Sequence, residues 1–138
     1  MADQPAQASS AQPAQAGRKV LCIEDERFIS ELYERVLTKG GYHVDTIADG
    51  KEALEAAQKN DYDIILLDLM LPNLSGIEIL RALKDPSRQP PLKAKIIVTT
   101  NLEQREDVRA DIEKQADGYI VKAELTPHEL VDLLDSIR

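Results

Sequence analysis

Carboxylates end two short apolar runs of this chain, at positions where they can act together. Asp68 follows the apolar residues 64–67, and Glu24 and Asp25 follow the apolar residues 20–23. A carboxylate that closes such a run lies at the carboxyl end of a strand, the edge of an open α/β sheet where ligands bind. If the two runs are neighbouring parallel strands, three carboxylates meet there. Because like charges repel, the grouping predicts a bound cation, and oxygen ligands suit Mg²⁺.

Two further polar groups end later strand candidates. Thr99 and Thr100 close the run 95–100, and Lys122 follows the run 118–121. A lysine and a hydroxyl beside a metal-bound carboxylate supply the charge and the hydrogen bond that a phosphoryl group needs. The chain contains neither G-x-x-x-x-G-K-[ST] nor G-x-G-x-x-G, the glycine-rich loops that cradle nucleotides. The phosphoryl group is therefore expected from a small donor or from another protein.

The elements that must position these groups alternate between strand and helix. Short runs rich in Ile, Val, Leu or Tyr predict strands at residues 19–24, 43–47, 62–67, 95–100 and 118–121. Helical periodicity fills the intervals, and one apolar face is expected after the first strand, with Phe28, Ile29, Leu32, Tyr33, Val36 and Leu37. This pattern predicts a five-stranded parallel sheet covered on both faces, a flavodoxin-like (βα)5 doubly wound sandwich.

Capping signals mark the helix starts. Asp49, Ser75 and Thr126 each stand three residues before a glutamate, the spacing of a capping box. Asn101 with Gln104 gives a weaker version for the helix after the fourth strand. The proline-containing stretch 85–91 is predicted to be a loop.

Length and charge limit the classes of function. The 138 residues fit one domain at 18–138, after an Ala/Gln/Pro-rich stretch at 1–17 that is expected to be a disordered tail. The net charge of -8 disfavours nucleic acid as a partner. One cysteine, no export signal and no membrane-spanning stretch favour a cytoplasmic protein with no membrane partner.

Four motifs in order along the chain carry a family resemblance. They are Ile23-Glu24-Asp25, Leu67-Asp68 with Leu71-Pro72 and Gly76, Ile97-Val98-Thr99-Thr100, and Gly118-Tyr119-Ile120-Val121-Lys122. From about Lys19 to Ile137 the chain resembles the receiver domain of a two-component response regulator, of the stand-alone, single-domain type. The resemblance implies a phosphorelay protein that catalyses phosphoryl transfer only to and from its own aspartate and is otherwise no enzyme.

The resemblance also implies roles at the carboxylate cluster. Asp68 is the expected phosphoacceptor. Mg²⁺ is the expected cofactor, held by Glu24, Asp25, Asp68 and the backbone carbonyl of Met70.

Around the phosphoryl group, the resemblance assigns Lys122, Thr100 and the backbone N–H of Asn101 as binding groups. Thr100 and Tyr119 are the expected switch pair. Thr100 is preferred to Thr99 because its interval to Lys122 fits receivers better, and neighbouring strand residues point to opposite faces.

The expected partners are proteins. A histidine kinase or a histidine phosphotransfer protein would supply the phosphoryl group. An unknown downstream target would bind the face formed by the fourth helix, the fifth strand and the fifth helix. The chain is expected to be a monomer, or a dimer that forms on phosphorylation.

Three positions depart from the receiver pattern. Asn101 stands where Ala or Gly is typical, and Ala123 stands where a proline with a cis peptide bond is common. Without that proline a cis bond costs about 3 kcal/mol and is not expected. Met70 and Leu102 are apolar where fast-hydrolysing relatives carry polar groups. Apolar side chains there exclude or misplace the attacking water, which predicts a long-lived phosphoaspartate.

Two other functions stay open from the sequence. A haloacid-dehalogenase-like phosphatase also uses an aspartyl nucleophile and Mg²⁺, but that family needs a second aspartate where this chain has Met70. A receiver-like binding module that works without phosphorylation is kept open by Asn101 and Ala123. Phosphorylation of Asp68 distinguishes this module from the leading interpretation.

Overall fold

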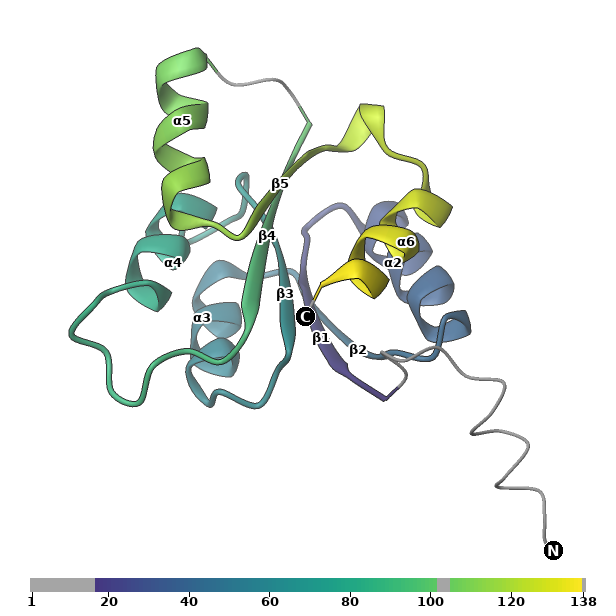
Figure 1. Ribbon diagram of the computed structural model, residues 1–138, viewed down its shortest axis with the longest axis horizontal. Helices are drawn as coiled ribbons and strands as arrows, with labels where there is room; N and C mark the ends of the chain where they lie inside the picture. Colours follow the sequence, from purple (N-terminus) through teal and green to yellow (C-terminus); the bar gives the residue numbers. More distant parts are fainter. Residues whose placement is uncertain (1–16, 102–104, 138) are drawn as a thin grey trace, which may run out of the picture.

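Parallel strands form the centre of the structure, a computed structural model in which residues 17–101 and 105–137 are described (Figure 1). The strands are β1 (Lys19–Ile23), β2 (His43–Ile47), β3 (Ile64–Asp68), β4 (Lys95–Thr100) and β5 (Gly118–Val121). The helices are α2 (Arg27–Lys39), α3 (Gly50–Gln58), α4 (Gly76–Leu83), α5 (Glu106–Gln115) and α6 (Pro127–Ser136), with a short 3-10 turn η1 (Lys122–Glu124).

The strands lie in the order β2-β1-β3-β4-β5, and every neighbouring pair is parallel. Helices α2 and α6 cover one face of the sheet, while α3, α4 and α5 cover the other (Figure 1). This arrangement confirms the predicted doubly wound sandwich.

Each face of the sheet has its own apolar core, because successive strand residues point to opposite sides. On β1, Val20 and Cys22 pack with α2 and α6, while Leu21 and Ile23 pack with the other three helices. Strand β3 is buried along its whole length, from Ile64 to Asp68. A strand buried on both faces reads as a continuous apolar run, which is why residues 64–67 were recognisable in the sequence.

Three of the predicted caps are present. Asp49 accepts a hydrogen bond from the backbone N–H of Glu52, and Ser75 and Thr126 each form a full capping box with the glutamate three residues on. The predicted cap at Asn101 was wrong. Helix α5 begins at Glu106, its N-cap residue is Arg105, and no side chain caps it. Residues 102–104, including Gln104, lie outside the described residues.

Other boundaries differ slightly from the prediction. Strand β3 begins at Ile64 rather than residue 62 and includes Asp68, while residues 85–91 contain neither helix nor strand, as predicted. On α2, Phe28 is 77% exposed, so its assignment to the buried face was wrong. Phe28 lies in the first turn of α2, near the carboxyl edge of the sheet. The buried residues of this helix are Ser30, Tyr33 and Leu37.

The amino-terminal prediction falls almost wholly outside the described residues. Of the stretch 1–17 only Gly17 is described, and its N–H donates to the carbonyl of Gly41 at 2.8 Å. Across residues 17–101 and 105–137, none of the helices is both long and apolar enough to pass through a lipid bilayer.

Candidate functional site

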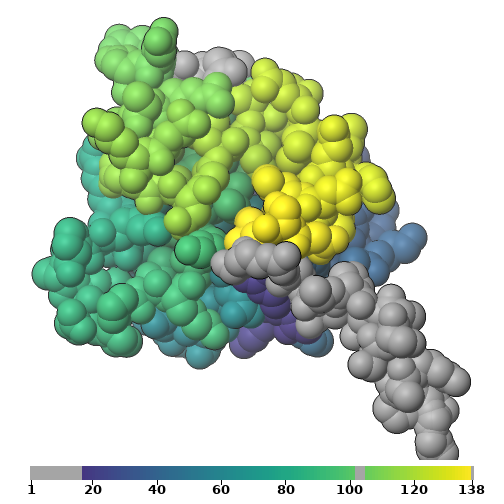
Figure 2. Space-filling model, viewed as in Figure 1, coloured from purple at the N-terminus to yellow at the C-terminus, as the bar shows by residue number. Residues whose placement is uncertain are grey.

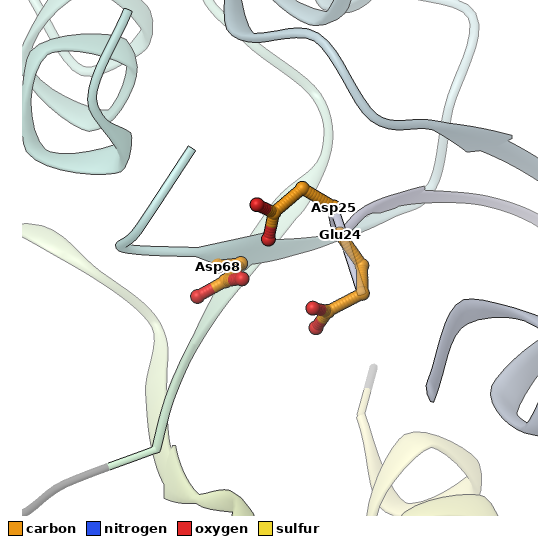
Figure 3. Close-up of side chains that lie close together, drawn as sticks. All are labelled: Glu24, Asp25 and Asp68. Carbon is orange, nitrogen blue, oxygen red and sulfur yellow. The ribbon is translucent and has the colours of Figure 1, made fainter. Parts of the chain in front are cut away.

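Carboxylates from two neighbouring strands meet at the carboxyl edge of the sheet, as the strand ends predicted. Strand β1 pairs with β3, with Ile23 opposite Leu67, so Glu24 and Asp68 follow adjacent positions. Glu24, Asp25 and Asp68 each place an oxygen within 4.8 Å of the others (Figure 3). Glu24 and Asp68 are buried, whereas Asp25 is exposed. The site therefore has two buried carboxyl groups and one that is open to solvent.

Lys122 supplies the positive charge of this site. Its Nζ lies 2.6 Å from Glu24 Oε1 and 3.3 Å from Asp68 Oδ2, and its side chain is almost fully buried. The residue directly follows β5 and opens the 3-10 turn η1. Within residues 17–101 and 105–137 the cis peptide bond is Gln89–Pro90, so the Lys122–Ala123 bond is trans, as expected without a proline. Contacts with Glu24 and Asp68 hold the Lys122 ammonium in the site.

Backbone donors of the loop after β3 hold the Asp68 carboxylate and tie the loop to β4. The N–H of Met70 donates to Asp68 Oδ1 at 3.1 Å, and the N–H of Leu69 donates to the carbonyl of Thr99 at 3.2 Å. Met70 is 69% exposed at this edge. One oxygen of Asp68 is thus held by a backbone donor and the other faces Lys122.

Burial and charge shift two protonation equilibria in the site. Burial raises the pKa of Glu24 to about 7, and the neighbouring Asp68 carboxylate adds to this while the hydrogen bond from Lys122 opposes it. Burial disfavours the charged form of Lys122, but Glu24 and Asp68 outweigh it and raise the pKa of the ammonium. Lys122 therefore stays charged at neutral pH, whereas Glu24 is close to its titration midpoint.

The two threonines of β4 lie on opposite faces. Thr99 is paired with Asp68 on one side and with Ile120 on the other, and both threonines are buried. Alternation along β4 places Thr100 on the same face as Val98, and Tyr119 packs on this side of the sheet. The predicted pair Thr100 and Tyr119 therefore shares a face.

Tyr119 is held between the sheet and α5. The Arg109 guanidinium carbon lies 4.5 Å from the centre of the Tyr119 ring, and the Tyr119 hydroxyl oxygen is buried. Asn101, the first residue after β4, is exposed at the same edge of the sheet as Lys122. Apart from Tyr119, which lies inside β5, the predicted site residues are the last residues of strands or follow them within two positions.

One residue of the site was missed by the sequence reasoning. Glu26 Oε1 lies 3.9 Å from Lys122 Nζ and 3.5 Å from Asn101 Nδ2. In the sequence Glu26 reads as an ordinary acidic residue at a helix start. Its position directly after Glu24 and Asp25 was the one feature of the sequence that could have indicated a place in the site.

Cys22 lies in β1 two residues before Glu24, as a free, buried cysteine. It is fully buried in β1, and burial raises the pKa of its thiol to about 12. A thiol of this kind is not nucleophilic at neutral pH.

Comparison with known proteins identifies the family. Residues 20–135 match the response regulator receiver domain family, and the chain belongs to it. Over 120 residues it is 41% identical to response regulator ArlR of Staphylococcus saprophyticus and 38% identical to ArlR of Staphylococcus aureus strain Mu50. These alignments cover 87% of this chain, which spans about half the length of each relative (50% and 51%).

Solved receiver structures share the fold. Chemotaxis protein CheY4 of Vibrio cholerae superimposes with a TM-score of 0.74 at 31% identity, covering 89% of this chain and all of the other. The receiver domain of a sensor histidine kinase from Pseudomonas aeruginosa PAO1 superimposes with a TM-score of 0.73 at 29% identity, covering 86% and 95%. That structure has a magnesium ion coordinated in its active site cleft. The chain is therefore a receiver domain of the response regulator family in both sequence and fold.

Proposed function

We propose that this receiver domain takes up a phosphoryl group on Asp68 and signals through protein contacts in a two-component phosphorelay. The observation that carries the proposal is the setting of the buried Asp68 carboxylate. Met70 N–H fixes its Oδ1, and the Lys122 ammonium lies 3.3 Å from its Oδ2. A structural aspartate needs neither a buried lysine nor two further carboxylates beside it.

The residues of the site fit an in-line phosphoryl transfer. An oxygen of Asp68 attacks phosphorus, and the bond from phosphorus to the leaving group breaks as that group takes the electron pair. Lys122 is placed to neutralise the negative charge of the phosphoryl oxygens. The product is an acyl phosphate, formed from the aspartate by the domain's own groups.

The carboxylate cluster fits a divalent cation. The three carboxyl groups of Glu24, Asp25 and Asp68 face the single ammonium of Lys122, and their oxygens lie within 4.8 Å of one another. These three residues, with the backbone carbonyl of Met70, would hold Mg²⁺. When bound, Mg²⁺ supplies charge neutralisation for the transferring phosphoryl oxygens.

Magnesium affinity should depend on pH through Glu24. Because the pKa of Glu24 is raised to about 7, a proton competes with the cation below that pH. We expect the apparent Mg²⁺ affinity to fall by up to about tenfold per pH unit as the pH drops below about 7. Calorimetric Mg²⁺ titrations at several pH values check this.

The Glu24→Gln variant is the control for the magnesium titrations, because it removes the titrating group. Its weaker affinity should change less with pH across the same range. Equal pH dependence in both proteins would show that another group controls the effect.

Phosphorylation is proposed to act through Thr100, the backbone N–H of Asn101 and Tyr119. A hydroxyl that turns toward the new phosphoryl oxygens leaves space for the ring of Tyr119 on the same face of the sheet. The shared face of Thr100 and Tyr119 supports this pairing. The change would be presented to a partner by α5, β5 and α6, which lie side by side at the surface (Figure 2).

The proposed phosphoryl donor is a histidine kinase or a histidine phosphotransfer protein, and the proposed location is the cytoplasm. Membership of the response regulator family supports a histidine-kinase donor in general. The downstream target and any phosphorylation-dependent dimer remain predictions.

The lifetime of the phosphoaspartate should be long because of Met70. Met70 is 69% exposed two residues after Asp68, and its thioether offers no strong hydrogen bond to orient an attacking water. We expect Met70→Asn to hydrolyse about tenfold faster than the parent domain, the lower range of a group that positions water. Leu102, the second residue behind this prediction, lies outside the described residues.

Release of radiolabelled phosphate from the purified phosphoprotein measures the effect of Met70→Asn. Met70→Leu is the matched control, since it keeps the position apolar. Loss of all phosphate from the parent domain within seconds would contradict the prediction.

Incubation with acetyl phosphate and Mg²⁺, followed by intact mass spectrometry, tests the proposed function. One added phosphoryl group that requires Mg²⁺ is the expected result. Failure of a folded protein to acquire it would favour a binding module that works without phosphorylation.

A further inference from the structure

The Glu26 side chain extends toward Lys122 and Asn101 instead of capping its own helix. Glu26 is the N-cap residue of α2, yet its carboxylate makes no capping hydrogen bond. Its backbone N–H donates to Glu24 Oε2 at 3.1 Å, which fixes the start of the helix beside the carboxylate cluster. The side chain then extends toward Lys122, 3.9 Å away.

Asn101 contacts Glu26 from the end of the strand on the other side of Asp68. Asn101 directly follows β4, and its Nδ2 makes a long hydrogen bond of 3.5 Å to Glu26 Oε1. Strands β1 and β4 are the two neighbours of β3 in the sheet. The pair, which we name the Glu26–Asn101 clasp, therefore joins the loops on both sides of the strand that ends in Asp68.

The clasp places a carboxylate beside the ammonium that faces Asp68. Lys122 is the cation that faces Asp68, and Glu26 lies within ion-pair distance of its ammonium. An incoming dianion meets the repulsion of Glu26 and competes with it for Lys122. Because the Glu26 side chain is 52% exposed, solvent screens part of this repulsion, and the effect on rate is modest.

We propose that Glu26, held by Asn101, determines donor specificity by disfavouring small anionic phosphoryl donors at Asp68. The favoured donor is a protein with a basic side chain beside its phosphohistidine. That side chain would form an ion pair with the Glu26 carboxylate, which leaves Lys122 free to bind the phosphoryl group. The inference rests on the proposed role of Asp68 as phosphoacceptor.

Charge is tested by Glu26→Gln, which keeps the shape and hydrogen bonding of the side chain. The rate constant for phosphorylation by acetyl phosphate, a dianion near neutral pH, should rise about three- to fivefold. Phosphoramidate, which carries less negative charge, should gain less, and added salt should reduce the gain for both donors. Glu26→Asp keeps the charge on a shorter side chain and should gain less than Glu26→Gln.

Glu31→Gln is the matched control. It removes the same charge from α2 at an exposed residue that pairs with Arg27 on the helix surface. Its rates should equal those of the parent domain. A gain as large as that of Glu26→Gln would assign the effect to net charge and overturn the proposal.

Asn101→Ala tests the clasp itself, because it frees Glu26 without changing any charge. We expect a smaller gain than for Glu26→Gln, and no further gain when the two changes are combined. Unchanged rates for Glu26→Gln in a domain that still accepts phosphate would overturn this inference and leave the role of Asp68 intact. No phosphorylation of the parent domain or of any variant would overturn both.

Discussion

Replacing Lys122 with methionine lowers the rate of phosphoryl transfer to Asp68 by about two to three orders of magnitude, the cost of losing a preorganised charge. Methionine keeps the length of the buried stem but removes the ammonium, which lies 3.3 Å from Asp68 Oδ2. The phosphoryl oxygens then lose the cation that this chain itself supplies. Time courses with acetyl phosphate at saturating Mg²⁺ measure the loss.

The same change alters stability in a pH-dependent way. Glu24 and Asp68 lose their buried cation, and the free energy of unfolding should fall by about 3 kcal/mol above neutral pH. The folded-state pKa of Glu24, about 7, lies above its usual 4.5. Stability from this carboxyl is therefore present below about 4.5 and is lost as the pH rises through about 7. Removing Lys122 should enlarge this loss.

Two controls separate chemistry from folding for Lys122→Met. Lys84→Met removes a lysine from a more exposed ion pair with Asp117 and should leave the transfer rate unchanged. The double variant Lys122→Met with Glu24→Gln should regain stability without regaining the rate. A loss of rate in Lys84→Met as large as that in Lys122→Met would show that the Lys122 ammonium has no special role beside Asp68.

Gly76→Ala should destabilise the domain by at least about 3 kcal/mol, a large effect for one methyl group. A Cβ on Gly76 would lie 2.2 Å from the carbonyl oxygen of Asp68 and 2.7 Å from the Cα of Leu69. Both neighbours are backbone atoms, so neither can move aside as a flexible side chain can. The start of α4 would be pushed away from the strand end that carries Asp68. Urea unfolding measures the change.

Gly40→Ala is the matched control for Gly76. Its added Cβ would meet the Cγ1 atom of Val131 at 3.1 Å, and this side chain can shift. Its cost should stay within about 1 kcal/mol. Similar losses in both variants would show that the close approach at Gly76 is not what matters.

The sequence predicted the features that depend on local rules. Short runs rich in Ile, Val, Leu or Tyr mark the strands, so four of the five begin at the predicted residue, and the buried β3 ends at Asp68. Capping depends on residues three positions apart, so Ser75 and Thr126 were identified as N-caps. The carboxylate cluster followed, because parallel strand ends meet at one edge.

Features that depend on tertiary contacts could not be predicted in the same way. Periodicity placed Phe28 on the buried face of α2, but the helix begins at Arg27 beside the open carboxyl edge, where Phe28 is exposed. Asn101 looked like a helix cap, and in the structure it contacts Glu26 from a different loop. Glu26 was missed because its contacts with Lys122 and Asn101 span 75 or more positions of the chain.

Chemical mapping of the phosphorylated residue tests the central claim most directly. The domain is incubated with acetyl phosphate and Mg²⁺, and the acyl phosphate is reduced with borohydride, which converts a phosphorylated aspartate to homoserine. Peptide mass spectrometry should find this conversion at position 68, dependent on Mg²⁺ and absent from Asp68→Asn. Conversion at another carboxylate, or a phosphoryl adduct of equal amount in Asp68→Asn, would contradict the assignment of Asp68 as the phosphoacceptor.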